Sequence, residues 1–551
     1  MQVKDDSIPI KIDYDYPTPM RDGTILRAMV YRPDDDDKHP VILCRTPYNK
    51  EVECQDYFDH FLAVKSGYVV VNQDTRGRGS SEGEFEPFVN EFNDGYDTVE
   101  YLAKTPWSDG NIGMYGASYV GFTQLATAVT NPPHLKVITP LLIGTIETSF
   151  PCRNGLYAVG TAVSWILQLC VDRSIKNGGK YMEDILEGYD NVEDWLKSIP
   201  AIGKKIIGEL NPFYLDWMEK SPDNDYWKRY DLGKRLKNIN IPILSVAGFY
   251  DVFIENTEKL FASMREGNQN FCKLIIGPWV HEIPWDSTAG DLNFGGKNNY
   301  ITFGMPQIHM KWFDRYLKGE ENGLENESTF QIFDMGTKEW LELDELPGET
   351  MTLYLSSEER QGLSLSLSPV QDSEIDILFD PDNPVPTLGG LPYRKTLLGA
   401  YEVNGAYDQR QIEARNDVLS FTANSVDKPI KILGNPVVTI YAKTPSEDLD
   451  ISLKLVDVHP DGKAFNLTES TVRGSFIQGQ KGEKIVPENI HKFDIKLPMT
   501  CISLKAGHSI RLDMACSNYP GFEVLKGKKC INKIFVGSKY PSNLVIPVKS
   551  H

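Results

Sequence analysis

The sequence predicts an α/β protein in which helices cover both faces of a parallel sheet, with a helical insertion and a C-terminal β-sandwich. Three observations support this fold class. Short apolar runs alternate with helical patterns up to about residue 145 and again after residue 231. Between these two stretches only helical patterns occur. Beyond about residue 329, polar and apolar residues alternate without a helical period.

The strands of the predicted parallel sheet are short apolar runs that lead into turns rich in Gly, Pro or Asp. These runs are Val41–Cys44, Tyr68–Val71, Ile112–Tyr115, Val137–Ile138, Ile241–Ala247 and Leu274–Ile276. Helical patterns such as Asp97–Ala103 and Tyr119–Val129 lie between them. In wound sheets of this kind, active sites lie beyond the carboxyl ends of the strands.

The helical insertion is predicted from three patterns, Ala162–Val171, Val192–Ile199 and Pro212–Lys220, which would form a cap over the sheet. An amphipathic helix at Met305–Leu317 then closes the α/β part. We expect three domains: an α/β domain from residues 1–145 and 232–325, a cap at 146–231, and a sandwich at 326–551.

The sandwich is predicted from alternation along its strands. Ile451, Leu453 and Leu455 would face one side, and Ser452 and Lys454 the other. Turn signals such as the Pro-Asp-Gly after His459 separate the strands. An antiparallel sandwich of the jelly-roll type is the simplest arrangement.

Charge and length exclude several classes of function. With 551 residues the chain is too long for a single small binding module. Its 57 basic and 77 acidic residues give a net charge of −20, which repels nucleic acid and anionic lipid. The N-terminus lacks the apolar stretch of a signal peptide, and the longest apolar-rich run, Thr161–Val171, is too short to span a bilayer. We expect a cytoplasmic protein without nucleic-acid or membrane partners.

The eight cysteines are scattered, with no Cys-x-x-C and no Cys/His pair at zinc spacing. We expect all of them to be reduced thiols in the core, and no metal site.

The sharpest local signal is Gly113-Met-Tyr-Gly-Ala-Ser-Tyr-Val-Gly121, where a strand turns directly into a helix with Ser118 at the turn. This arrangement is typical of a nucleophile elbow, which needs small neighbours such as Gly116. The second glycine of the usual G-x-S-x-G pattern is displaced by one position. The alternative is that Ser118 only caps the following helix.

A nucleophilic serine needs a base, and in α/β-hydrolases the chain order is serine, acid, histidine. Three of the nine histidines follow Ser118 and precede the predicted sandwich. His134 and His309 are expected to be structural, whereas His281 lies in the loop after a predicted strand. His281 is therefore the predicted base.

Asp251 ends the preceding strand, in Gly248-Phe-Tyr-Asp251, and is the predicted acid that orients His281. The alternative is that Asp251 caps the next helix. An acyl-transfer site also needs an oxyanion hole. The backbone N–H of Tyr119 supplies one donor, and the hydroxyl of Tyr48 in the early loop could supply the second, unless Tyr48 is an ordinary half-buried tyrosine.

The chain resembles the serine hydrolases of the cocaine esterase, α-amino acid ester hydrolase and X-Pro dipeptidyl-peptidase family. The resemblance covers nearly the whole chain and rests on motifs in the same order: Arg45–Tyr48, Asp74–Gly83, Gly116–Gly121, Gly248–Asp251, Gly277–His281, Trp312–Gly319 and Val456–Gly462. It implies an α/β-hydrolase fold with a helical cap and a C-terminal jelly roll. The family also has Gly-x-Ser-Tyr-x-Gly at the elbow, so the displaced glycine is expected.

Carried over residue by residue, the resemblance implies Ser118 as nucleophile, His281 as general base and acid, Asp251 as its orienter, and Tyr48 with the Tyr119 amide as oxyanion hole. It implies no metal and no organic cofactor, and it suggests self-association. Many members have Trp where this chain has Phe249. The Asp74–Gly83 loop contains arginines, as phosphate sites do, but its residue spacing fits neither a P-loop nor a Rossmann turn. We interpret it as structural support at the edge of the sheet.

The predicted function is acyl transfer to water from small ester or amide substrates. We expect Trp165, Leu169 and Phe249 to line the acyl pocket, although packing of the cap explains the run Ala162–Leu169 equally well. An X-Pro dipeptidyl-peptidase, or an α-amino acid ester hydrolase or β-lactam acylase, would instead need carboxylates that hold an α-ammonium. Candidates are Glu147, Asp172, Glu183, Asp184 and Glu282. A non-catalytic carbohydrate-binding protein is the rival from another class.

Overall fold

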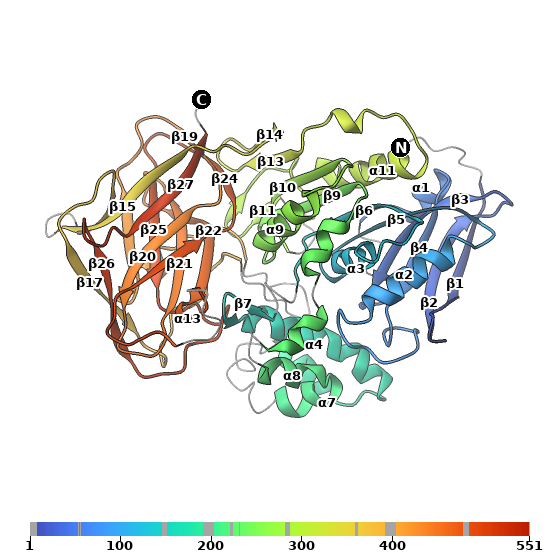
Figure 1. Cartoon of the computed structure of the whole chain (residues 1–551), viewed down its shortest axis with the longest axis horizontal. Coiled ribbons are helices and arrows are strands. Elements are labelled where there is room, and N and C mark those ends of the chain that lie inside the picture. The colour runs from blue at the N-terminus through green and yellow to red at the C-terminus, as the bar shows by residue number, and fades with distance from the viewer. Residues whose placement is uncertain are drawn as a thin grey trace.

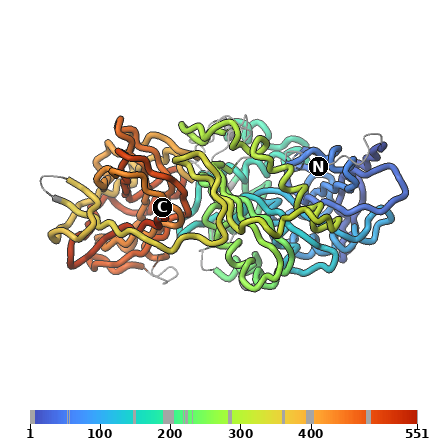
Figure 2. Tube along the Cα trace, turned by 90° about the horizontal axis from the view of Figure 1, so that it is seen from above, coloured from blue at the N-terminus to red at the C-terminus, as the bar shows by residue number. Residues whose placement is uncertain are grey.

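The computed structural model describes residues 8–52, 54, 57–145, 151–190, 203–220, 224–230, 232–281, 287–358, 362–391, 404–477 and 484–549. A β-sandwich lies beside an α/β part, and the cap helices lie below the junction in Figure 1. Seen from above, the N-terminal half and the sandwich occupy opposite ends of an elongated molecule (Figure 2).

The α/β part is built on a ten-stranded sheet whose six central strands carry all six predicted apolar runs. In spatial order the strands are β1 (Ile10–Pro19), β2 (Ile25–Pro33), β4 (Val69–Asp74), β3 (His39–Thr46), β5 (Ser108–Ala117), β6 (Leu135–Leu141), β9 (Ile243–Tyr250), β10 (Cys272–Val280), β13 (Phe330–Asp334) and β14 (Glu339–Leu343). Pairing is parallel from β4 to β13 and antiparallel at both ends.

Helices cover both faces of this sheet, as the continuous apolar strands require. Along β4, Val69 and Val71 face one core and Val70 the other. The first core contains α2 (Glu91–Leu102), α3 (Tyr119–Ala128) and α9 (Ile254–Arg265), and the second contains α1 (His60–Lys65) and α11 (Met305–Leu317). The carboxyl ends of the parallel strands are thereby held rigidly at one edge of the sheet.

The cap consists of a short hairpin followed by helices. Its described elements are β7 (Cys152–Arg153), β8 (Leu156–Tyr157), α4 (Val159–Lys176), α5 (Met182–Asp190), η2 (Gly203–Ile207), α7 (Gly208–Leu210), α8 (Phe213–Glu219), η3 (Asp225–Tyr230) and η4 (Gly233–Asn238). Trp165 on α4 stacks on Trp217 on α8, with ring centroids 6.1 Å apart. The predicted helix at Val192–Ile199 lies outside the described residues.

The sandwich strands pair antiparallel, except that β16 and β18 run parallel. The strands are β15 (Thr350–Glu358), β16 (Gly362–Ser366), β17 (Ser373–Phe379), β18 (Leu419–Ala423), β19 (Ile430–Gly434), β20 (Val437–Lys443), β21 (Asp450–Val458), β22 (Ala464–Arg473), β23 (His491–Lys496), β24 (Thr500–Leu504), β25 (Ser509–Ala515), β26 (Cys530–Val536) and β27 (Asn543–Lys549). Short elements complete the fold: β11 (Thr288–Ala289), β12 (Leu292–Asn293), α10 (Tyr300–Phe303), η5 (Leu324–Asn326), α12 (Arg410–Glu413) and α13 (Gly474–Ile477).

The face of β21 that carries polar side chains is buried. The sequence pattern predicts only that polar and apolar side chains lie on opposite faces of this strand. Lys454 donates to the carbonyl of Leu388 and to the side-chain oxygen of Gln409, both at 3.0 Å. Connecting segments therefore cover this face, and the polar side chains are hydrogen-bonded there instead of meeting solvent.

Strands β13 and β14, which follow residue 326, belong to the sheet of the α/β part. Phe330 of β13 pairs in parallel with Leu274 of β10, and β14 extends the same sheet to Leu343. We therefore propose that the sandwich domain begins at β15, with the remaining division into α/β part and cap as expected from the sequence.

The expectation that all eight cysteines are reduced is wrong for one pair. Cys44, on β3, and Cys54 form a disulfide, with Cα atoms 6.4 Å apart, within the usual range for such bonds. The other six cysteines are free. Cys44 and Cys54 are ten residues apart, and no sequence motif links them. Only the folding of the chain back onto β3 brings their thiols together.

Among the described helices, none combines the length and apolar character needed to cross a bilayer.

Candidate active site

Ser118 lies in the sharp turn between β5 and α3. Its φ of 57° is positive and its ψ is −124°, a backbone conformation that costs a non-glycine residue free energy. The Ser118 amide donates to the carbonyl of Leu141 at 2.9 Å, and the Phe122 amide donates to the Ser118 carbonyl at 3.0 Å. These bonds tie the strained turn to β6 and to α3.

Gly116 is required by this turn. Its φ is +125°, and a Cβ atom added there would lie 2.2 Å from Cγ1 of Val120. Any side chain would therefore collide with the first turn of α3. The small residue two positions before Ser118 is explained by this contact.

Asp251 and His281 reach Ser118 from two neighbouring strands. Each of the three residues comes directly after a strand, namely β5, β9 and β10. Nε2 of His281 lies 3.0 Å from Oγ of Ser118, and Nδ1 of His281 lies 2.6 Å from Oδ1 of Asp251. Asp251 is fully buried, whereas 12% of the His281 side chain is exposed. This continuous chain of hydrogen bonds can move a proton from the serine to the imidazole.

The capping alternatives for Ser118 and Asp251 do not fit the structure. Ser118 precedes α3, but its side chain makes no capping hydrogen bond. Helix α9 begins at Ile254, and Phe253, not Asp251, occupies its N-cap position. Both side chains instead point toward His281.

The two other histidines considered as bases have structural contacts. Nδ1 of His134 lies 2.9 Å from a carboxylate oxygen of Glu100. His309 on α11 is fully buried, with Nδ1 3.0 Å from Oγ1 of Thr139, and burial lowers its pKa to about 3. Neither lies among the described residues that line the pocket of Ser118.

Tyr48 lies two residues beyond the end of β3 and lines the same pocket as Ser118 and Tyr119. The indole N–H of Trp165, on cap helix α4, donates to the Tyr48 hydroxyl at 2.6 Å. The hydroxyl of Tyr119 donates to a carboxylate oxygen of Glu91 at 2.9 Å and accepts from the Phe88 amide at 2.8 Å. These two hydrogen bonds fix the Tyr119 side chain.

The loop of residues 74–83 supports the Tyr48 loop. Asp74 accepts hydrogen bonds from the Lys50 amide at 2.8 Å and the Lys50 ammonium at 3.1 Å. Arg78 is buried and donates to the carbonyls of Pro47 at 2.8 Å and Leu169 at 3.2 Å. Arg78 therefore connects the residue before Tyr48 to the cap helix that carries Trp165.

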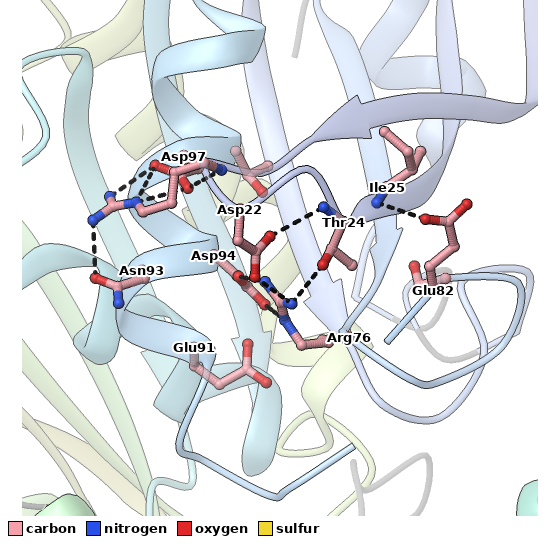
Figure 3. Close-up of polar contacts among 12 residues, drawn as sticks. Asp22, Thr24, Ile25, Arg76, Glu82, Glu91, Asn93, Asp94 and Asp97 are labelled. Atoms are coloured by element: carbon pink, nitrogen blue, oxygen red, sulfur yellow. Dashed lines mark hydrogen bonds and ion pairs between the residues drawn. The ribbon is translucent and has the colours of Figure 1, made fainter. Parts of the chain in front are cut away.

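Arg76 of the same loop is also paired within the chain, as Figure 3 shows. It donates to both carboxylate oxygens of Asp94, at 2.7 and 2.9 Å, and to Asp22 and Thr24 at 2.8 and 2.7 Å. The Arg76 guanidinium and the Thr24 amide lower the pKa of Asp22 to about 2. These contacts agree with the interpretation of the loop as structural support.

The pocket beside Ser118 encloses about 450 Å³ of empty space, the open solvent at its mouth included. It is largely aromatic. Its described lining consists of Tyr48, Phe88, Ser118, Tyr119, Gly144, Thr145, Thr161, Trp165, Phe253 and His281. The Phe253 ring meets the His281 imidazole edge to face, with centroids 5.0 Å apart.

Of the three predicted pocket residues, only Trp165 is in this lining. Phe249 (1% exposed) and Leu169 (0% exposed) are packed in the core. Leu169 follows Trp165 by one helical turn, about 6 Å farther along the axis, which carries it past the pocket toward Arg78. Phe249 lies inside β9, two residues before the loop that faces the pocket.

Sequence reasoning missed Phe88 and Phe253 as lining residues. Phe253 lies only two residues after Asp251, a position that could have suggested it. Phe88 has a φ of 69° in a loop without any motif, so its direction follows only from the folded backbone.

The acidic residues considered as ammonium-binding groups do not line the pocket where the structure describes them. Asp172 lies 3.4 Å from Arg78 and 3.5 Å from Lys176. Glu183 and Asp184 are exposed on α5. Glu147 and Glu282 lie outside the described residues.

Comparison with known proteins extends over both halves of the chain. The X-Pro dipeptidyl-peptidase (S15) family matches residues 22–282, and the X-Pro dipeptidyl-peptidase C-terminal non-catalytic domain matches residues 322–545. The cocaine esterase of Rhodococcus sp. (strain MB1 Bresler) is 30% identical, in an alignment that covers 96% of this chain and 97% of the esterase.

Solved structures share the whole fold. An α-amino acid ester hydrolase matches with a TM-score of 0.81 at 22% identity, over 100% of this chain and 98% of that one. An aminopeptidase from a marine sediment Thaumarchaeota archaeon matches with a TM-score of 0.81 at 21% identity, over 98% and 97% of the two chains. With the sequence relatives, these findings show that the chain is a serine hydrolase of the cocaine esterase and X-Pro dipeptidyl-peptidase family, with the fold of an α/β-hydrolase followed by a β-rich domain.

Proposed function

We propose that Ser118 is the nucleophile of this hydrolase, His281 the general base and acid, and Asp251 the group that orients His281. The observation that carries this assignment is the unbroken hydrogen-bonded series from Asp251 through His281 to Ser118 Oγ. We further assign the oxyanion hole to the Tyr48 hydroxyl and the Tyr119 backbone N–H, because both residues line the pocket at Ser118.

In the first step, Ser118 Oγ attacks the acyl carbonyl carbon while its proton moves to Nε2 of His281. The carbonyl oxygen becomes negative and is stabilised by the two oxyanion donors. The buried carboxylate of Asp251 stabilises the imidazolium that forms. The Nε2 proton then passes to the leaving alkoxide or amine, its bond to the acyl carbon breaks, and the acyl-enzyme remains.

In the second step, water takes the place of the leaving group. His281 removes a proton from the water as its oxygen attacks the acyl carbon, and returns it to Ser118 Oγ as the ester bond breaks. The free acid leaves, and the enzyme regains its starting state. All protons in the cycle pass through one nitrogen of His281.

Trp165 supports the assignment of Tyr48. Its indole N–H can only donate, so at 2.6 Å the Tyr48 oxygen must be the acceptor. Accepting this bond polarises the Tyr48 O–H toward a negative partner. We therefore assign Trp165 as a positioning residue for the oxyanion hole as well as a wall of the pocket.

We propose that the preferred substrates are esters with an apolar, aromatic-sized acyl group. The lining contains the rings of Phe88, Trp165 and Phe253, and no carboxylate among its described members. An α-ammonium buried there would lose its water without gaining a paired charge. The name of the Rhodococcus relative also refers to an ester substrate.

The test of substrate class is the ratio of kcat/KM for phenylacetic acid methyl ester to that for phenylglycine methyl ester, which differ only in the α-amino group. We expect a ratio of at least about ten in favour of phenylacetate, equivalent to about 1.4 kcal/mol. A tenfold preference for phenylglycine would instead indicate an α-amino acid ester hydrolase or an X-Pro peptidase, and would direct attention to Glu147 and Glu282.

The test of the nucleophile is Ser118→Ala in purified protein. We expect kcat for phenylacetic acid methyl ester to fall by at least about 10⁴-fold while thermal stability is kept, because no other group can form the acyl-enzyme. Activity above a trace in this variant would overturn the assignment without affecting membership of the family.

We also propose that the protein works in the cytoplasm, because six of its eight cysteines are free, four of these are buried, and only the pair Cys44 and Cys54 forms a disulfide. Cell fractionation tests this location. Self-association stays a prediction from the family resemblance, and sedimentation velocity of the full chain would test it.

A further inference from the structure

Asp457, His459 and His508 form a cluster in the sandwich, away from the pocket of Ser118. Asp457 lies near the end of β21, His459 in the turn between β21 and β22, and His508 directly before β25. One potential ligand atom from each residue lies within 4.8 Å of the other two. Among the described residues, this is the one such group of three or more His, Cys, Asp or Glu side chains.

Both imidazoles contact the same carboxylate, one at each of its oxygens. Nδ1 of His508 lies 2.8 Å from Oδ1 of Asp457, and Nε2 of His459 lies 3.3 Å from Oδ2 of the same carboxylate. The two imidazole centroids are 4.4 Å apart. Donors that bind one Zn²⁺ at about 2.0–2.2 Å are separated by about 3.0–3.5 Å, so small side-chain adjustments suffice to form the site.

The cluster is held by the fold. The His459 amide donates to the Lys463 carbonyl at 2.8 Å, which closes the turn between β21 and β22. The Val426 amide donates to the His508 carbonyl at 2.9 Å, which fixes the start of β25. Asp457 pairs with Ile510 of β25 and with Phe465 of β22. Ligands fixed on three backbone segments lose little conformational freedom when an ion binds.

The site is also reachable from solvent. Asp457 is 8% exposed and His508 12%, whereas His459 keeps 30% of its side chain exposed. An ion can therefore enter on the His459 side and keep water as a further ligand. Binding requires only that each neutral imidazole carries its proton on the nitrogen that does not face the ion.

We propose that Asp457, His459 and His508 bind a divalent transition-metal ion of the zinc type and thereby tie the β21–β22 turn to the start of β25. Two imidazoles and one carboxylate favour Zn²⁺ over Mg²⁺ or Ca²⁺, which prefer oxygen ligands. The site stabilises the sandwich and takes no part in ester hydrolysis. It departs from the expectation of no metal site, which rested on the spacing of the cysteines and of Cys/His pairs.

The experiment is isothermal titration of chelator-treated full-length protein with Zn²⁺, and in parallel with Co²⁺, whose visible absorption reports the ligand field. We expect one equivalent of Zn²⁺ to bind and the thermal unfolding midpoint to rise. Both effects should be lost in Asp457→Asn and His459→Ala. Because His459 is the most exposed of the three, its variant should fold even if Asp457→Asn does not.

The matched control is His134→Ala, because His134 also pairs with a carboxylate, that of Glu100, but lacks a second imidazole. It should bind Zn²⁺ like the wild type. Turnover of phenylacetic acid methyl ester by His459→Ala should match the wild type with and without chelator. Absence of a bound equivalent in the wild type, or binding unchanged in both His459→Ala and Asp457→Asn, would overturn the proposal.

Discussion

Asp251 and His281 reach Ser118 from the ends of strands of one sheet, whereas Tyr48 depends on contacts from outside that sheet. The first two follow β9 and β10 directly, and the hydrogen bonds of these strands fix their separation. Tyr48 receives a hydrogen bond from Trp165 in the cap, and Arg78 of a separate loop holds the carbonyl of the preceding residue.

The residues proposed for proton transfer and those proposed for substrate selection are thus held by different parts of the molecule. The three residues of the proposed triad follow strands of the α/β part, so the sheet alone aligns their side chains. Trp165 on cap helix α4 both contacts Tyr48, the proposed oxyanion donor, and lines the pocket. We therefore expect a change in the cap to alter transition-state stabilisation and substrate fit together. We expect variants of the proposed triad and variants of Tyr48 and the cap to lose activity in different ways.

The largest effect is expected on the triad side, for Asp251→Asn. The amide keeps the size of the carboxylate but presents the wrong partner to Nδ1 of His281, so the imidazole is held in the wrong tautomer. We expect kcat to fall by about 10⁴-fold with little change in KM. Steady-state kinetics on phenylacetic acid methyl ester measures both constants. A loss below about tenfold would mean that Asp251 does not orient the base.

On the oxyanion side, Tyr48→Phe removes one donor and keeps the ring. We expect kcat to fall by about 10²–10³-fold, because one hydrogen bond to the oxyanion is lost while the triad is intact. KM should change little. A rise in KM with unchanged kcat would show that Tyr48 binds the ground state and leaves the oxyanion to other donors.

A smaller effect is expected for Trp165→Phe, which keeps an aromatic wall but removes the indole N–H. We expect kcat to fall by about tenfold in the wild type and to be unchanged in the Tyr48→Phe background, because the bond acts through Tyr48. Trp217→Phe is the matched control in the same cap. Equal losses in both backgrounds would show that Trp165 acts independently of Tyr48.

The smallest effect concerns stability, at the contact between α9 and the sandwich. The Glu258 carboxylate accepts bonds from Asn435 at 2.8 Å and the Met499 amide at 3.0 Å, and burial raises its pKa to about 7. Because the folded-state pKa exceeds the unfolded value, this group's favourable contribution is complete below about pH 4.5 and is lost as pH rises through 7.

Glu258→Gln keeps one of the two acceptor oxygens and cannot ionise. The loss of the other acceptor costs the same at every pH, so only the difference between two pH values reports the titration. Relative to the wild type, we expect it to raise the free energy of unfolding by about 1–2 kcal/mol more at pH 8 than at pH 4.5, after allowing for the partial exposure of the carboxyl. Urea unfolding at both pH values measures this, and exposed Glu266→Gln serves as control. An equal effect at both pH values would mean that Glu258 does not titrate in this range.

The same contrast explains what the sequence could predict. Ser118, Asp251 and His281 each follow a recognisable apolar strand, so local pattern and chain order were sufficient to select three side chains that the structure brings within hydrogen-bond distance. Phe88 and Phe253 take their directions from loop backbone, and Leu169 was misplaced because its distance from the pocket depends on how α4 lies on the sheet. The Cys44–Cys54 disulfide and the position of β13 in the first sheet likewise depend on contacts that no local pattern encodes.

The assignment of the nucleophile is tested most directly by intact-mass spectrometry after reaction with a fluorophosphonate, followed by peptide mapping. We predict one adduct per chain, on Ser118, formed at a rate that falls in parallel with activity in Asp251→Asn and absent in Ser118→Ala. An adduct on another residue, or a catalytically active wild type that forms no adduct, would contradict the account.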